Sequence, residues 1–149
     1  MRNAKMDSLD LLVGRWDLTL SDAFFLEPPG TEVRGRATGS WIGEAFVLLA
    51  VELGEGRQTF VLGRSDANDA YAAFYHDDRG VNRVFAMEFD GASWTLLRED
   101  PDFHQRWVSE IMPDRIAGRW EASEDAGATW RKDFDLVFER RSEQEAEER

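Results

Sequence analysis

Few side chains in this sequence are of types that could carry out chemistry. His76 closes the stretch YAAFYHDD, and His104 lies within PDFHQRW. If the first stretch is extended, His76 and Asp78 point to the same side and could be two ligands of a metal ion. No third ligand can be identified. Tyr75, His76 and His104 are the groups that could act as an acid or base, because such sites carry no spacing signature.

No spacing pattern of a known catalytic apparatus is present. The chain has no Gly-x-Ser-x-Gly elbow, no phosphate-binding glycine loop and no His-Glu-x-x-His pattern. Cysteine is absent, which removes disulfides, thiolate nucleophiles and cysteine-held metals. We therefore name no catalytic residue. If the protein is an enzyme and not a binding protein, we expect an isomerase or hydrolase that acts on a small hydrophobic substrate.

Three arginines interrupt otherwise apolar alternation, namely Arg64, Arg83 and Arg98. Arg83 is the best candidate for an inward position, because apolar residues bracket it on the same face. An inward arginine can hold a carboxylate through forked, charge-assisted hydrogen bonds. The alternative is that these arginines lie at rims and pair with the abundant acids.

The stretch FHQRW raises the same question for an amide. Gln105 shares a face with Phe103 and Trp107, so inward rings would place Gln105 inside an apolar interior, with His104 and Arg106 facing outward. A buried amide needs a hydrogen-bond partner from the protein, water or a ligand.

Extended segments separated by turn residues dominate the chain. One short helix is expected around Ser8–Val13, with Asp7 or Ser8 as its cap. Asp90-Gly91 between two alternating runs is a strong hairpin signal. The expected strands are Gly14–Ser21, Thr31–Trp41, Ala45–Leu53, Gln58–Arg64, Ala70–His76, Val81–Phe89, Ser93–Arg98, His104–Met112, Arg115–Ala122 and Trp130–Arg140.

Short strands joined by tight turns form an antiparallel meander, which would expose two edges unless it closed. We therefore predict an all-β fold, a single antiparallel meander closed into a barrel of roughly ten strands with a short N-terminal helix. One domain covers residues 1–141, and the charged segment 142–149 is expected to be a flexible tail. The segment Ala45–Leu53 is apolar on both faces, so we expect the helix or a partner subunit to cover its outer face.

The tripeptide Gly-Arg-Trp occurs at Gly14–Trp16 and again at Gly118–Trp120. A short helix, then Gly14-x-Trp16, then a basic residue ending the last strand resembles the calycins, the lipocalin and fatty-acid-binding-protein superfamily. The resemblance implies a calycin-like barrel in which Trp16 plugs the closed end and Arg140 or Arg141 lies over its ring. We interpret the second copy as structural, with Gly118 relieving crowding and Trp120 filling the wall or core.

A longer stretch, Asp77–Arg141, is similar to a bacterial lipocalin-like family that has no agreed chemistry to transfer. The family resemblance implies the fold alone. A heme-binding branch of such barrels uses a histidine ligand. Neither His76 nor His104 clearly has the apolar surroundings of an axial ligand, so we expect no cofactor and keep heme on one of these histidines as the alternative.

The barrel predicts a function in binding, inside the barrel, of a small hydrophobic or amphipathic ligand, which could carry a carboxylate. Arg83 and Gln105 would orient its polar head. Six Trp and ten Phe could instead fill the barrel, which would then serve as a dimerisation module. The expected lining residues are Trp16, Trp41, Phe85, Trp107, Trp120 and Phe134.

The formal net charge of −12 makes nucleic acid and anionic membranes poor partners. No stretch approaches the roughly 20 apolar residues that span a bilayer, and the N-terminal apolar run is too short for a signal peptide. We expect a cytoplasmic protein whose partner is a small apolar or amphipathic molecule, with a homodimer left open.

Overall fold

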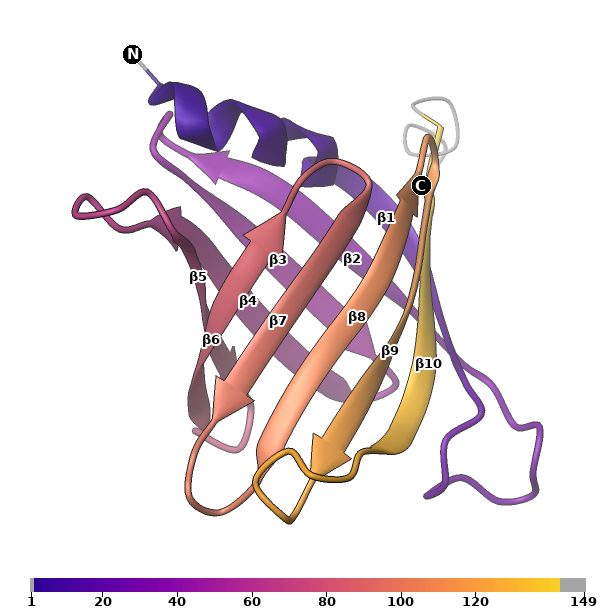
Figure 1. Ribbon diagram of the computed structural model, residues 1–149. Helices are drawn as coiled ribbons and strands as arrows, with labels where there is room; N and C mark the ends of the chain where they lie inside the picture. The colour runs from indigo at the N-terminus through magenta and orange to yellow at the C-terminus, as the bar shows by residue number, and fades with distance from the viewer. Residues whose placement is uncertain (1, 143–149) are drawn as a thin grey trace.

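Ten antiparallel strands form one closed barrel in the computed structural model, which describes residues 2–142 (Figure 1). Each strand pairs with its neighbours in the chain, and β1 closes the barrel on β10. The strands are β1 Gly14–Ser21, β2 Val33–Ile42, β3 Phe46–Leu53, β4 Gly56–Arg64, β5 Tyr71–Asp77, β6 Asn82–Phe89, β7 Ser93–Glu99, β8 His104–Met112, β9 Arg115–Ser123 and β10 Arg131–Arg140. The predicted fold class is confirmed. Of the predicted tail, residues 143–149 lie outside the described part of the chain.

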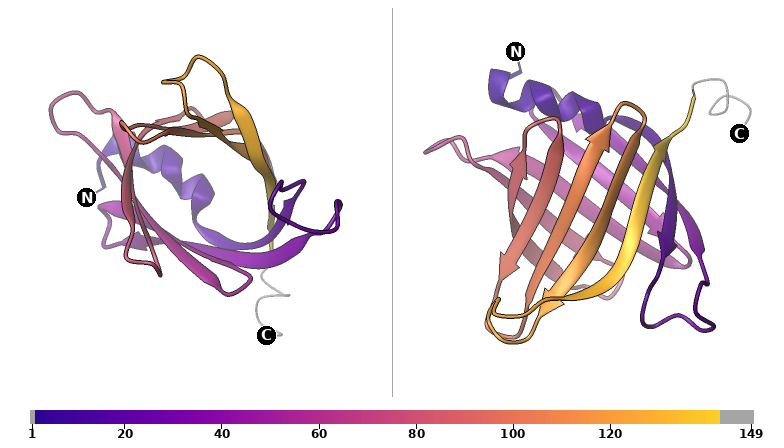
Figure 2. Two further views of the ribbon diagram at one scale, coloured as in Figure 1. Left: turned by 90° about the horizontal axis from the view of Figure 1, so that it is seen from below. Right: turned by 45° about the vertical axis from the view of Figure 1, so that its right-hand side comes forward.

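A short 3-10 helix, η1 (Ala4–Leu12), crosses one end of the barrel (Figure 2). It begins earlier than the sequence indicated, because Asn3 rather than Asp7 or Ser8 caps it by accepting a hydrogen bond from the Lys5 amide. Its buried side chains, Met6, Leu9 and Leu12, recur every third residue, which suits three residues per turn. They close this end of the barrel. No helix among residues 2–142 is long and apolar enough to cross a membrane.

The first Gly-Arg-Trp fastens this closed end. Trp16 is buried, and its indole Nε1 donates to the Leu12 carbonyl at 3.1 Å. Arg140 lies over the ring at 4.2 Å and donates to the carbonyls of Leu11 (2.6 Å) and Val13 (2.9 Å) where the helix ends. A side chain at Gly14, whose φ is +128°, would lie 2.7 Å from the Arg140 guanidinium. The glycine therefore gives both the turn into β1 and the space for Arg140.

Of the two arginines expected over Trp16, Arg140 takes that place. Arg141 instead pairs with Asp17 on the outer side of β1, at 2.7 Å.

The second Gly-Arg-Trp belongs to the packing of the core. A Cβ atom at Gly118 would lie 2.6 Å from the ring of Trp107 on the neighbouring strand. The indole of Trp107 therefore packs directly against the backbone of Gly118, where a larger residue would clash. Trp120 contacts Trp107, Phe85 and Phe60, with ring centroids 5.6, 5.5 and 6.4 Å apart.

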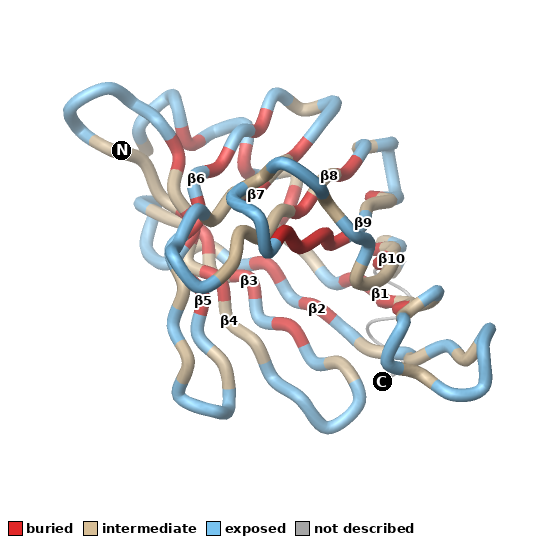
Figure 3. The backbone as a smooth tube through the Cα atoms, turned by 60° about the horizontal axis from the view of Figure 1, so that its bottom comes forward, coloured by how far each residue is buried: buried red, intermediate tan, exposed pale blue. Residues whose placement is uncertain are grey.

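These rings and the aliphatic residues around them fill the barrel. Buried positions alternate along the strands, while the connecting loops are mostly exposed (Figure 3). A cavity between Trp94, Trp107 and Trp120 has a volume of about 20 Å³, space for about one water molecule. A ligand has no room at this depth.

Candidate functional site

The end of the barrel opposite η1 is open and holds a pocket of about 680 Å³, which we call the mouth pocket. Loops β1–β2, β5–β6, β7–β8 and β9–β10 surround it (Figure 1). Its walls are partly aromatic and partly charged. The lining residues are Phe24, Phe25, Arg79, Arg83, Asp102, Phe103, Gln105, Ala122, Glu124, Arg131, Asp133 and Phe134.

Arg83 is half-buried inside this opening. Its guanidinium donates to the Gln105 side-chain oxygen at 3.2 Å. The same guanidinium lies 5.6 Å from the ring of Tyr75 and 5.2 Å from that of Phe103, within the range of cation–π attraction. A neutral amide and two rings thus hold the cation in place.

The acids around the mouth pocket are already matched with other arginines. Asp102 pairs with Arg98 at 3.1 Å, and Asp133 pairs with Arg131 at 2.8 Å.

Glu124 also lies within 3.8 Å of Arg131. Within residues 2–142, no carboxylate oxygen lies within 4 Å of the Arg83 guanidinium, so its charge is left for another anion.

A second polar group stands beside Arg83. The Tyr75 hydroxyl donates to Asp77 at 2.7 Å, and Arg79 donates to the same carboxylate at 2.6 Å. Burial and the neighbouring Asp77 carboxylate raise the pKa of Tyr75 to about 12. Hydrogen bonds from Arg79 and Tyr75 hold the pKa of Asp77 far below its usual range. At neutral pH, Tyr75 is therefore a hydrogen-bond donor, with its proton held too firmly for it to act as a base.

Alkaline titration tests this arrangement. Because folding raises the pKa of Tyr75 above the unfolded value near 10, the contribution of the protonated phenol is complete below pH 10 and is lost as the pH rises to about 12. We expect a loss of about 2 kcal/mol in the free energy of unfolding across that range, which Tyr75→Phe removes. In Tyr71→Phe, Tyr75 is the single remaining tyrosine, and its absorbance change should have a midpoint near pH 12. A midpoint near pH 10 would contradict the hydrogen-bonded arrangement.

Three of the predicted ligand-binding residues meet in the mouth pocket, namely Arg83, Gln105 and Phe134. Three others, Phe85, Trp107 and Trp120, lie in the filled core.

The remaining two predicted residues lie at the closed end. Trp16 packs under η1, and Trp41 donates to Asp10 at 2.8 Å with Arg2 stacked on its ring at 3.6 Å. Arg64 and Arg98 follow the alternative reading of the sequence, because they pair with Asp69 and with Asp100 and Asp102.

The sequence interpretation missed the contribution of the β1–β2 loop. Phe24 and Phe25 are 65% and 53% exposed, and Phe25 contacts Phe134 with ring centroids 5.9 Å apart. Two adjacent aromatic residues in a loop of polar residues and prolines are a usable signal, since exposed apolar side chains on loops often mark binding sites.

Both histidines face outward. His76 lies exposed on the outer face, opposite Thr59 and Asn82, and the His104 ring lies 6.5 Å from that of Trp130. Neither imidazole reaches the interior, so neither is placed to ligate a heme there. Across the described residues, no three His, Asp or Glu side chains gather in a way that could hold a metal ion.

A closed ten-strand antiparallel meander with a short N-terminal helix fits the calycin-like class of β-barrels. Among solved structures, Rv2717c from M. tuberculosis aligns with a TM-score of 0.67 at 11% sequence identity, over 95% of this chain and 100% of that chain. At this identity the likeness concerns the fold.

A de novo designed fluorescence-activating β-barrel aligns with a TM-score of 0.45 at 12% identity, over 91% of this chain and 98% of that chain. No protein-family model and no curated protein matches the sequence.

Proposed function

We propose that the protein binds a small amphipathic carboxylate at the mouth of the barrel. The observation that carries this proposal is Arg83, a half-buried cation held by an amide and two aromatic rings without a carboxylate partner in residues 2–142. A ligand carboxylate supplies that missing partner through charge-assisted hydrogen bonds.

Gln105 orients the same head group. Its oxygen accepts from Arg83, which leaves its amide nitrogen as a further donor toward the ligand. The apolar part of the ligand then lies against Phe25, Phe103 and Phe134, which line the mouth pocket. Since the core below is filled, the proposed ligand is compact and does not descend into the barrel.

The same proposal places the chain with the bacterial lipocalin-like proteins that Asp77–Arg141 resembles. Its support is the closed ten-strand antiparallel barrel, which is the fold that the resemblance implies. The proposed site differs from a lumen-binding lipocalin arrangement in lying at the rim.

Isothermal titration with 4-phenylbutyrate and 4-phenylbutan-1-ol tests the proposal, because the two probes share a hydrocarbon part and differ in the head group. We expect saturable 1:1 binding of the carboxylate, at least about tenfold tighter than the alcohol, as charged hydrogen bonds contribute about 1.5–3 kcal/mol. The Gln105 side-chain amide signals in a ¹⁵N-correlated NMR spectrum should shift with the same saturation. Equal affinities for acid and alcohol would contradict a site built around Arg83.

A further inference from the structure

The outer surface of β3–β6 is poor in charge, because its charged outward residues, Glu52, Arg57 and Glu88, lie only at the ends of these strands. Four apolar residues stand directly opposite one another on adjacent strands, in the order Leu48, Val61, Phe74 and Val84. Phe74 and Val84 are 49% and 60% exposed. We call the outward positions of β3–β6 around this row the apolar face; they are Phe46, Leu48, Ala50, Thr59, Val61, Gly63, Ala72, Phe74, His76, Asn82, Val84 and Ala86.

The other half of the barrel has the opposite character, in keeping with a chain in which 32% of residues are charged. Its outward positions on β1, β2, β8, β9 and β10 include Arg15, Asp17, Arg34, Arg36, Arg106, Glu110, Arg119, Glu121, Asp135 and Glu139. Depletion of charge at the centre of a patch, rather than general hydrophobicity, is what distinguishes protein interfaces from ordinary surface.

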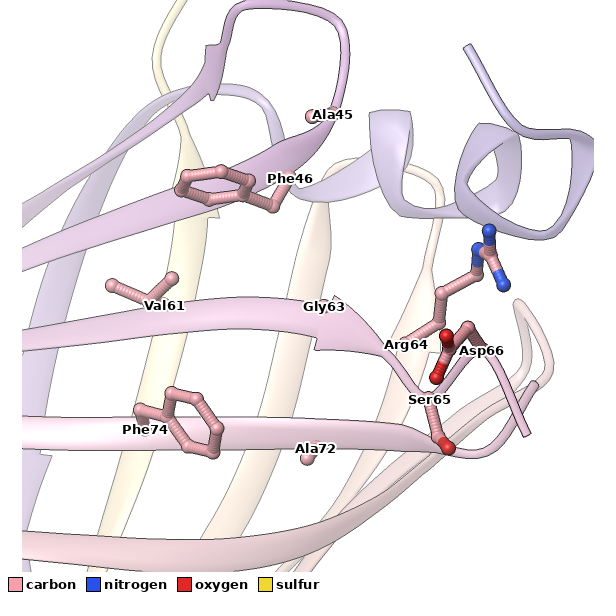
Figure 4. A pocket seen from close by; sticks show the side chains of 9 residues that line it. All are labelled: Ala45, Phe46, Val61, Gly63, Arg64, Ser65, Asp66, Ala72 and Phe74. Carbon is pink, nitrogen blue, oxygen red and sulfur yellow. The ribbon is translucent and has the colours of Figure 1, made fainter. Parts of the chain in front are cut away.

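The apolar face is also shaped. Phe46 on β3 and Phe74 on β5 border the hollow, and the small residues Gly63 and Ala72 leave it a volume of about 580 Å³ (Figure 4). Beside the hollow, Phe74 and Val84 project into solvent. One patch therefore carries both a projection and a recess, which is one way for a surface to be self-complementary, as a two-fold symmetric contact requires.

We infer that the apolar face is the interface of a homodimer, in which Phe74 of each copy enters the hollow of the other. Four strands about 4.8 Å apart, with three outward rows about 6.7 Å apart, cover about 400 Å², roughly half of the area that each partner of a standard interface buries.

The edge of the face completes that area with two ion pairs and with the exposed Glu88 of β6. Glu52 and Arg57 lie 3.8 Å apart at one end, and Arg64 and Asp69 pair at 2.9 Å at the other.

The net charge of the chain determines how association of such a dimer depends on ionic strength. Each copy carries a formal net charge of −12, so two copies repel each other electrostatically. The attraction between them comes from burial of the apolar face. Salt screens the repulsion and leaves apolar burial intact. Association should therefore strengthen as the ionic strength rises, the reverse of a contact made through opposite charges.

Sedimentation equilibrium tests this inference from about 1 μM to about 300 μM protein, in low and high salt, a range that brackets typical weak homodimers. We expect a monomer–dimer equilibrium that tightens with salt. Phe74→Asp and Val84→Asp should each raise the dimer dissociation constant at least about tenfold, because both bury a carboxylate without a partner.

Phe24→Asp is the matched control, since it makes the same change at an exposed ring on the mouth loop. It should leave the dimer intact. Circular dichroism checks that the variants are folded. Phe74→Asp should bind 4-phenylbutyrate with unchanged affinity, which would show that this interface and the mouth pocket are separate sites. A wild-type monomer throughout the range, a dimer that survives both apolar-face substitutions, or a dimer that weakens with salt would each overturn the inference.

Discussion

Replacing Arg83 by glutamine is expected to weaken the binding of 4-phenylbutyrate about thirtyfold while leaving the affinity for 4-phenylbutan-1-ol unchanged. The substitution keeps a polar side chain next to Gln105 and removes the cation that meets the carboxylate. Charge-assisted hydrogen bonds contribute about 1.5–3 kcal/mol, which corresponds to a loss between about tenfold and 150-fold. Isothermal titration of both probes against both proteins measures the difference directly.

Arg79→Gln is the control for this substitution, because it removes the same charge from the same pocket. Arg79 is already engaged by Asp77 at 2.6 Å, so its loss should weaken carboxylate binding by less than about threefold, the scale of a screened surface charge. Equal losses in the two variants would show that the mouth pocket attracts anions by general charge alone. No loss in Arg83→Gln would remove Arg83 from the site.

Phe85→Ala is expected to lower the free energy of unfolding by about 3–5 kcal/mol, the usual cost of deleting a buried aromatic ring. Phe85 is 1% exposed. It follows Arg83 by two residues on the inward side of β6, deeper in the barrel than the mouth pocket. Its ring contacts Trp120, Tyr75 and Phe60, with centroids 5.5, 6.3 and 6.5 Å apart. Urea unfolding followed by tryptophan fluorescence gives the change.

Phe74→Ala is the matched control for Phe85→Ala, since it removes the same ring from an exposed position. Measured below the concentration at which the protein associates, it should change the free energy of unfolding by less than about 1 kcal/mol. A small effect of Phe85→Ala would mean that the rings do not pack tightly and that the interior is more open than its 20 Å³ cavity indicates.

Much of the fold follows from the sequence, because strands in a barrel have a strict period of two. Alternation around Trp107 places Gln105 inward and His104 outward, and both positions agree with the structure. The glycine of Asp90-Gly91 has a φ of +86° in the turn between β6 and β7, as a tight hairpin requires. Local chemistry decides these features.

The candidate site depends on contacts that local patterns do not contain. Whether the aromatic residues leave a cavity depends on fits such as the Trp107 ring over Gly118, which lie on different strands. Phe25 reaches Phe134 from an irregular loop, so no periodicity predicts the contact. Whether an arginine of the mouth pocket forms an ion pair depends on which loops meet there.

The fastening of the closed end has a consequence for the order of folding in the cell. Arg140 binds the carbonyls of Leu11 and Val13, residues that precede it by 129 and 127 positions. During synthesis on a ribosome, η1 therefore emerges long before β10, the strand that carries its anchor. The barrel can close only after β10 has emerged, and contacts of such long sequence separation form slowly. Until then the nascent chain exposes β1 as an open edge, which is a template for pairing with other chains.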